Sequence, residues 1–171
     1  MKRISIIGSL LVVAGVAVLA AGGGKMKITS SAFQESGTIP EKFSKNGQNS
    51  SPELRIEGVP AEAKSLAVIV DDPDAPVGLF THWLVWNINP KTNEITEGSA
   101  PSGAVQGKND FGEIGYGGPQ PPSGTHRYFF KVFALNQMLN LKSGAKRKEV
   151  DAAMKAHIIA QGSLMGKYSK K

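Results

Sequence analysis

The fold is decided by the stretch SLAVIVDDPDAP, which occupies residues 65–76. Its first half, residues 65–70, is an unbroken apolar run, and its second half is an acidic turn stiffened by two prolines. An apolar run of this length that ends in turn residues is typical of a buried central strand. The carboxylates that follow it lie where an unpaired charge would be costly, so we expect them to be paired, solvated or part of a site.

Two further apolar runs, residues 83–88 and 128–135, have the same character, and shorter strands are expected at 26–30 and 54–56. The 20 glycines and 10 prolines add many turns, so one mainly β domain is predicted. From residue 146 to 164 the apolar period changes to that of a helix, which predicts one C-terminal helix.

The first residues have the pattern of a secretory signal peptide. Lys2 and Arg3 precede an apolar segment, residues 4–21, and Gly22-Gly23-Gly24 follows as a linker. We interpret residues 1–24 as a signal peptide or, alternatively, an N-terminal membrane anchor, and residues 25–171 as the folded domain. An exported protein is expected, periplasmic or secreted, with anchoring to the inner membrane as the alternative.

The composition excludes several classes of function. The chain has no cysteine, so disulfides, thiolate chemistry and a lipoprotein anchor are excluded. The net charge is +6, with many lysines near the C-terminus. We interpret these as a solvated surface, with attraction to an anionic membrane as the alternative. Aromatic residues are not interleaved with this charge, so no nucleic-acid partner is expected.

Candidate site residues occur where rigid loops enter strands. His82 and His126 each begin such a strand, and Asp72 ends one. Because side chains alternate along a strand, His126 and Tyr128 share a face while Arg127 points away. We therefore predict that Asp72, His82, His126 and Tyr128 converge on one pocket, and that Arg127 pairs with a structural carboxylate, either Asp110 or Glu113.

The loop before His126 is rich in glycine and proline. Gly117 and Gly118 would let backbone amides approach a ligand, and residues 119–122 would form a stiff wall. Exposed amides beside imidazoles favour an anion.

Five motifs resemble those of one known family. They are Asp-Pro-Asp-Ala-Pro at 72–76, Thr-His-Trp-Leu at 81–84, Asn-Asp-Phe-Gly at 109–112, Gly-Tyr-Gly-Gly-Pro at 115–119 and His-Arg-Tyr at 126–128. Together they resemble the phosphatidylethanolamine-binding proteins, and within them the bacterial Raf-kinase-inhibitor-like (YbhB/YbcL) branch. The resemblance covers residues 26–168. The chain departs from the family pattern at two places. Ile56 stands where bacterial relatives often have Trp, and the Gly124-Thr125-His126 spacing is shorter than in animal members.

The resemblance implies an antiparallel β-sandwich with a C-terminal α-helix and a small cavity for phosphate-like anions. The ligand-binding residues that we expect are Asp72, Asp74, His82, Gly118, Gln120, Pro122, His126 and Tyr128. The expected ligand is a phosphate-like anion or a phospholipid head group, and a kinase or protease is a further candidate partner. No cofactor, metal or catalytic residue is expected.

Two other functions remain open at this point. His82, His126 and Asp72 could form a divalent-metal triad. A hydrolase using Ser123 is less well supported, because the chain lacks the Gly-x-Ser-x-Gly elbow.

Overall fold

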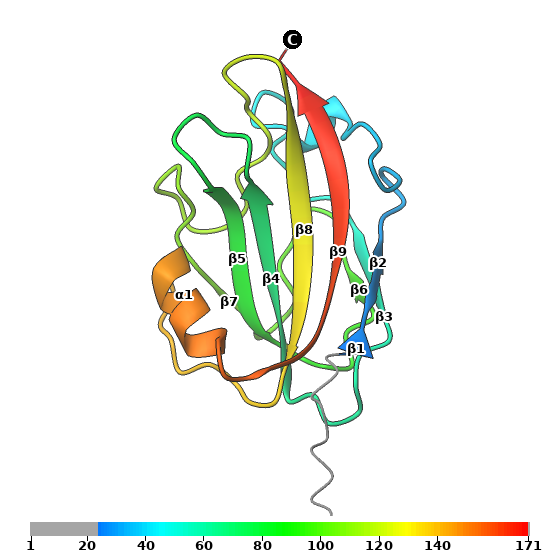
Figure 1. Cartoon of the computed structure of the whole chain (residues 1–171), viewed down its shortest axis with the longest axis vertical. Helices are drawn as coiled ribbons and strands as arrows, with labels where there is room; N and C mark the ends of the chain where they lie inside the picture. Colours follow the sequence, from blue (N-terminus) through cyan, green and yellow to red (C-terminus); the bar gives the residue numbers. More distant parts are fainter. Residues whose placement is uncertain (1–23, 171) are drawn as a thin grey trace, which may run out of the picture.

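The structure, a computed structural model, describes residues 24–170 and contains two packed β-sheets and one α-helix (Figure 1). The larger sheet has six strands in the order β1-β9-β8-β4-β5-β7, and the smaller has three in the order β2-β3-β6. The elements are β1 (Gly24–Lys25), β2 (Lys27–Thr29), η1 (Glu41–Phe43), β3 (Leu54–Glu57), β4 (Ser65–Asp72), β5 (Phe80–Ile88), β6 (Glu94–Ile95), β7 (Val105–Gln106), β8 (Thr125–Leu135), α1 (Arg147–Met154) and β9 (Ile158–Ser169). The predicted mainly β sandwich is confirmed; among the pairs of named strands in residues 24–170, β1–β9 is parallel and the others are antiparallel.

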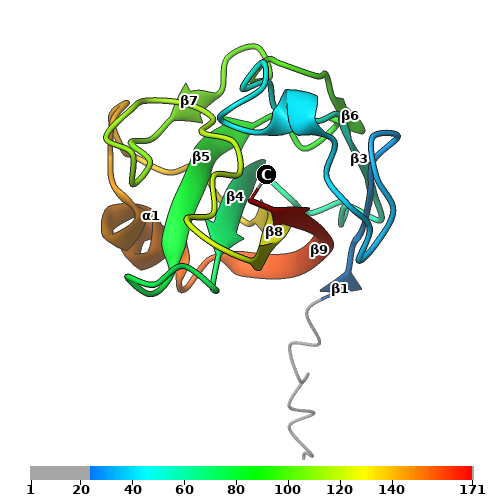
Figure 2. The ribbon, with the colours of Figure 1, turned by 90° about the horizontal axis from the view of Figure 1, so that it is seen from above.

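Strand β4 is the centre of the larger sheet, paired on both sides and buried at every residue. Its even-numbered apolar residues, such as Val68, face the core between the two sheets. Its odd-numbered ones, such as Ile69, face a second core beneath α1. Figure 2 shows why both faces need apolar side chains: the large sheet lies between α1 and the strands β3 and β6. The continuous apolar run at 65–70 is therefore the expected pattern of a strand covered on both faces.

Helix α1 is held to the large sheet by apolar and ionic contacts. Val150 and Met154 are its buried residues and pack in the second core. Arg147, at its first turn, pairs with Asp71, which is fully buried at the end of β4. Lys131 of β8 contacts the other oxygen of the same carboxylate, with Nζ 2.9 Å from Oδ2. Two cations thus compensate the buried Asp71.

The predicted C-terminal helix is too long. It ends at Met154, and the residues predicted to continue it form the twelve-residue strand β9. The physical reason is tertiary pairing: β9 lies antiparallel to β8 from Ser169 to Ile158. Gly162 and Gly166 allow β9 to pack closely on the residues that face it. A Cβ at position 162 would lie under 3.0 Å from Met26, and one at position 166 under 3.0 Å from Ile39. The helical period in this segment was coincidental.

The predicted signal peptide or anchor lies outside the described residues. Within residues 24–170 no helix is both long and apolar enough to cross a membrane.

Candidate functional site

The candidate site lies at the end of the sandwich where β4 ends and β8 begins. In Figure 1 the loop between β4 and β5, the loop before β8 and the η1 segment gather at this end, drawn at the top. The last two residues of β4 point to opposite faces of the sheet. Asp71 faces α1, and Asp72 faces the interior of the sandwich, where it meets His126.

Asp72 and His126 form a buried pair. His126 Nδ1 lies 2.7 Å from Asp72 Oδ2, and the two side chains are only 8% and 4% exposed. The other carboxylate oxygen, Oδ1, accepts the backbone N–H of Asp74 at 2.8 Å. Both oxygens of Asp72 are therefore engaged. The carboxylate requires a proton on Nδ1 of His126 and leaves Nε2 for another partner.

A β-bulge turns His82 into the interior. Val70 pairs with Trp83 and Asp71 pairs with Thr81, so His82 is the extra residue of β5 between these two pairs. Simple alternation would place His82 and Trp83 on opposite faces, but both are buried on the core side. Bulges commonly redirect a side chain beside a site in this way.

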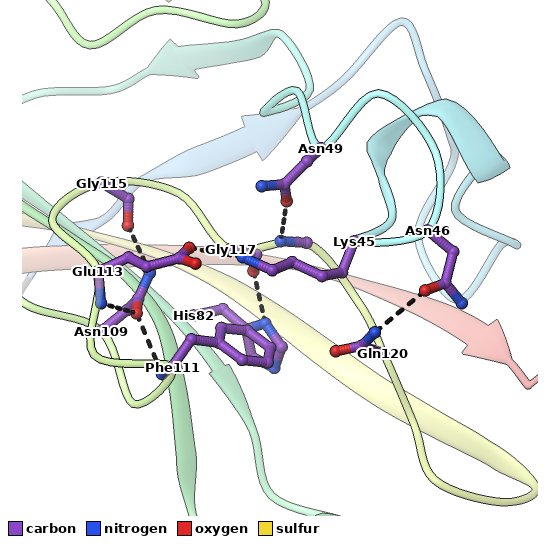
Figure 3. A network of polar contacts seen from close by, with 11 residues as sticks. Lys45, Asn46, Asn49, His82, Asn109, Phe111, Glu113, Gly115, Gly117 and Gln120 are labelled. Atoms are coloured by element: carbon purple, nitrogen blue, oxygen red, sulfur yellow. Dashed lines mark hydrogen bonds and ion pairs between the residues drawn. The ribbon is translucent and has the colours of Figure 1, made fainter.

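His82 is held as a neutral imidazole. Its Nδ1 donates to the carbonyl of Gly117 at 2.6 Å (Figure 3). The Gly117 N–H in turn donates to the carbonyl of His82 at 2.9 Å. Burial lowers the pKa of His82, and this outweighs the opposing effects of the Gly117 carbonyl and of the Asp72 charge. Since Nδ1 carries the proton, Nε2 is an acceptor in the free protein.

Tyr128 completes the interior of the site. Its ring packs edge-on against His82, with ring centroids 5.1 Å apart. Its hydroxyl is fully buried near Asp72 and makes no hydrogen bond of good geometry within residues 24–170. Burial, reinforced by the Asp72 charge, raises the pKa of Tyr128, so the phenol stays protonated. A buried hydroxyl without a partner is costly unless a ligand or water satisfies it.

The glycine loop is held by two asparagine side chains that were not among the predicted site residues (Figure 3). Asn49 Oδ1 accepts the N–H of Gly118 at 2.7 Å. Asn109 Oδ1 accepts the N–H groups of Phe111 and Glu113, and its Nδ2 donates to the Gly115 carbonyl. These asparagines replace strand pairing as the support of the loop.

The amides of Gly117 and Gly118 consequently have internal acceptors. The predicted anion nest at these two residues is not formed, because His82 and Asn49 occupy the donors. Gly118 has a packing role instead: a Cβ there would lie 2.2 Å from the Phe43 carbonyl oxygen.

Arg127 pairs with Asp74, so the predicted partners Asp110 and Glu113 are wrong. Two guanidinium nitrogens and the backbone N–H of Arg127 donate to Asp74 at 2.7–2.9 Å. The start of β8 adjoins the turn after β4, which brings Asp74 close. The hydrogen bonds from Arg127 lower the pKa of Asp74 to about 2. Asp74 thus braces the turn rather than lining the pocket.

Asp110 and Glu113 have other roles. Asp110 Oδ2 accepts the N–H of Thr81 at 2.7 Å, which steadies the start of β5. Glu113 pairs with Lys45, whose Nζ also lies 4.8 Å from the centre of the Phe111 ring.

The resulting pocket has a volume of about 240 Å³ and a mixed lining. Its lining residues are Asp72, Ala75, Pro76, Val77, Phe80, His82, Phe111, Gln120 and Pro122. Four of the predicted residues are thus in the lining: Asp72, His82, Gln120 and Pro122. His126 and Tyr128 lie behind the lining, in contact with Asp72 and His82 respectively.

The apolar walls were missed by the sequence analysis. Phe80 and Phe111 pack on each other at 4.8 Å and both contact the His82 ring. Phe80 stands two residues before His82, a position that alternation could have suggested. Nothing in the local sequence of Phe111 indicates that its loop folds back over the pocket.

The histidines considered for the two alternative functions, a metal site and a hydrolase, have other contacts in the structure. Within residues 24–170 no three His, Asp or Glu side chains are placed to hold one metal ion. The Nδ1 atoms of His82 and His126 are also committed, to the Gly117 carbonyl and to Asp72. Ser123 is exposed in its loop, and in the described part of the chain no hydrogen bond joins it to a histidine.

The two sheets and the pocket between their loops define a class, the β-sandwich ligand-binding proteins. The sequence profile of the family described as phosphatidylethanolamine-binding protein matches residues 29–169. A UPF0098 protein of Pyrococcus horikoshii is 48% identical to the chain, over 98% of this chain and 89% of its own length.

Solved structures agree in fold. A phosphatidylethanolamine-binding protein homologue of Chlamydia trachomatis is similar with a TM-score of 0.82 and 44% identity, over 86% of this chain and 99% of its own. YbcL of Escherichia coli, described as a member of the mammalian PEBP family, has a TM-score of 0.81 and 34% identity, over 85% and 99%. The chain belongs to the phosphatidylethanolamine-binding protein family, as its motifs predicted.

Proposed function

We propose that this protein binds, without turning it over, a small ligand that joins a phosphate-like anion to an apolar group. The observation that carries the proposal is an apolar-walled pocket with His82 in its lining, Nε2 unpaired, and the unpaired hydroxyl of Tyr128 buried directly behind that lining. The export suggested by residues 1–24 remains part of the proposal.

The polar end supplies both donors and acceptors. Tyr128 is a donor, since its proton is retained, and His82 Nε2 is an acceptor. A phosphate monoanion matches both, because it carries acceptor oxygens and one P–OH donor. Asp72 fixes the ring of His126, whose Nε2 adds a donor when protonated. Such bonds to an ion are stronger than neutral ones.

The size and walls of the pocket limit the rest of the ligand. A volume of about 240 Å³ is below the usual range for whole drug-sized molecules. It suits a phosphorylated head group rather than a complete lipid. Phe80, Phe111 and Pro122 provide an apolar lining for the substituent. Val77, 82% exposed at the rim, extends this apolar lining outwards.

The chain offers a direct test, because it has only three histidines. We expect inorganic phosphate and phosphoethanolamine to shift the imidazole NMR signals of His82 and His126. His157 is the internal control, since its Nδ1 is paired with Asn136 beside the start of β9. Equal shifts at all three histidines, or none, would contradict the proposal.

Matched variants sharpen this test. Tyr128→Phe keeps the ring but removes the donor, and we expect roughly tenfold weaker phosphate binding from the loss of one charge-assisted hydrogen bond. His157→Gln should leave the affinity unchanged. An unchanged affinity in Tyr128→Phe would remove the phenol from the site.

A further inference from the structure

A second concave surface lies next to the pocket lined by Asp72 and His82, which we call the histidine pocket. It is a groove of about 400 Å³, and we call it the Tyr168 groove. Its lining residues are Asn46, Gln120, Pro121, Pro122, Tyr168 and Lys170. Gln120 and Pro122 line both the groove and the histidine pocket, so the two hollows are separated only by this short segment.

Tyr168 is one of the lining residues of the groove. It pairs with His126 across β8 and β9, so the second hollow begins one strand away from the buried Asp72–His126 pair. The residue is only 4% exposed, and no hydrogen bond engages its hydroxyl within residues 24–170. The hydroxyl oxygen of Tyr168 is not fully buried, and the groove that Tyr168 lines gives access to it.

Two more donors accompany the Tyr168 hydroxyl. Gln120 Nε2 donates to Asn46 Oδ1 at 3.0 Å, which turns the amide of Asn46 so that its Nδ2 is free to donate (Figure 3). Lys170 supplies a positive charge, and no ion pair within residues 24–170 engages its ammonium group. The lining contains no carboxylate. A phenol, an amide and an ammonium group, with no carboxylate among the described lining residues, favour an anion.

We propose that the Tyr168 groove is a subsite for a second anionic group of the same ligand. The first anion lies in the histidine pocket, and the linking atoms cross the segment formed by Gln120 and Pro122. The ligand class is therefore a small molecule with two phosphate-like groups joined by a short linker. This inference rests on the proposed function, because it assumes that the histidine pocket holds the first anion.

Linked anions provide the test. Alkanediol bisphosphates with three to six carbons are compared with the corresponding monophosphates by calorimetry. We expect at least one bisphosphate to bind tenfold or more tightly than its monophosphate, because the second contact is intramolecular. Tyr168→Phe and Lys170→Gln should remove this gain while changing the monophosphate affinity less than twofold.

A matched variant controls for net charge. Lys167→Gln removes the same charge near the end of β9, just before Lys170, but Lys167 does not line the groove. It should retain the tenfold gain. Equal binding of mono- and bisphosphates, or equal losses from Lys167→Gln and Lys170→Gln, would overturn the subsite.

The two proposals fail in different ways. Monophosphates that shift His82 and His126 without any bisphosphate gain would refute the subsite and leave the pocket. Phosphates that perturb Tyr168 but neither histidine would refute the proposed function of the pocket, and with it the two-point ligand.

Discussion

Phosphate binding to this protein should be coupled to the uptake of a proton. In the free protein His82 Nε2 has no proton, because Nδ1 donates to the Gly117 carbonyl and burial lowers the pKa of the ring. A phosphate dianion offers only acceptors, so it cannot bond to this nitrogen. Either the ligand binds as its monoanion or the ring becomes protonated. Both routes add one proton to the complex.

The magnitude follows from the proton count. The second pKa of a phosphate monoester is about 6. Above it, the population of the binding form falls tenfold per pH unit, and so should the affinity. Between pH 7 and pH 9 we expect about a hundredfold loss, or about 2.7 kcal/mol at about 1.36 kcal/mol per unit. The charges that act on the ring from neighbouring elements are Asp72 and Asp71 of β4, with the neutral phenol of Tyr128 in ring contact.

Calorimetry in buffers of different ionisation enthalpy measures this proton directly. At pH 8 the uptake should be close to one proton per phosphate bound. In His82→Gln the amide can donate to a dianion without any proton, so the pH dependence should flatten. A pH-independent affinity between pH 7 and pH 9 would refute the assignment of His82 as a neutral acceptor. Full proton uptake in His82→Gln would transfer the role to another group.

The structure makes three further predictions. The Asp74 carboxyl should titrate near pH 2 by NMR. Because the pKa of Asp74 is lowered in the folded protein, its pairing with Arg127 stabilises the fold above pH 4, and this stabilisation is lost as the pH falls towards 2. An Asp74 titration midpoint near pH 4 would contradict the pairing. Arg147→Met should lower the free energy of unfolding in urea by about 3 kcal/mol, since it breaks the buried pair with Asp71. As a control, Asp151→Asn removes the exposed acceptor of the same arginine and should cost under about 1 kcal/mol. Equal costs would mean that Lys131 alone is sufficient to compensate the charge of Asp71. Gly118→Ala should lower the free energy of unfolding by about 1–3 kcal/mol through overpacking against the Phe43 carbonyl, and it should shift the NMR signal of the Asn49 side-chain amide. A variant of unchanged stability with an unchanged spectrum would show that the loop accommodates the extra methyl group without strain.

The C-terminal segment shows where local patterns are insufficient. Residues 158–164 match a helical period, yet they form the start of β9 because β8 offers eleven paired positions. Glycines at 162 and 166 were the available signal, since they alternate with Ala160, Leu164 and Tyr168 along one inward face. Pairing between strands separated by a helix depends on tertiary contacts, and a window of one segment does not contain them.

The loop residues show the same limit. Asn49 accepts from the Gly118 amide and Asn109 donates to the Gly115 carbonyl, but the local sequence of neither asparagine predicts these contacts. Arg127 was assigned to the wrong carboxylates, because residues 127 and 74 become neighbours only when β8 pairs with β4.

The sequence by itself determined the two-sided burial of β4, the strands that carry the site, and the placement of Asp72, His126 and Tyr128 on one inward face. Burial and alternation are local properties, which the order of apolar and polar residues records. Only the tertiary structure decided that a bulge turns His82 inward, that the glycine amides are already occupied, and that Phe80 of β5 and Phe111 of a distant loop wall the pocket. Those features depend on which backbone groups meet across the sandwich, and hydrogen bonds between distant segments leave no period in the chain.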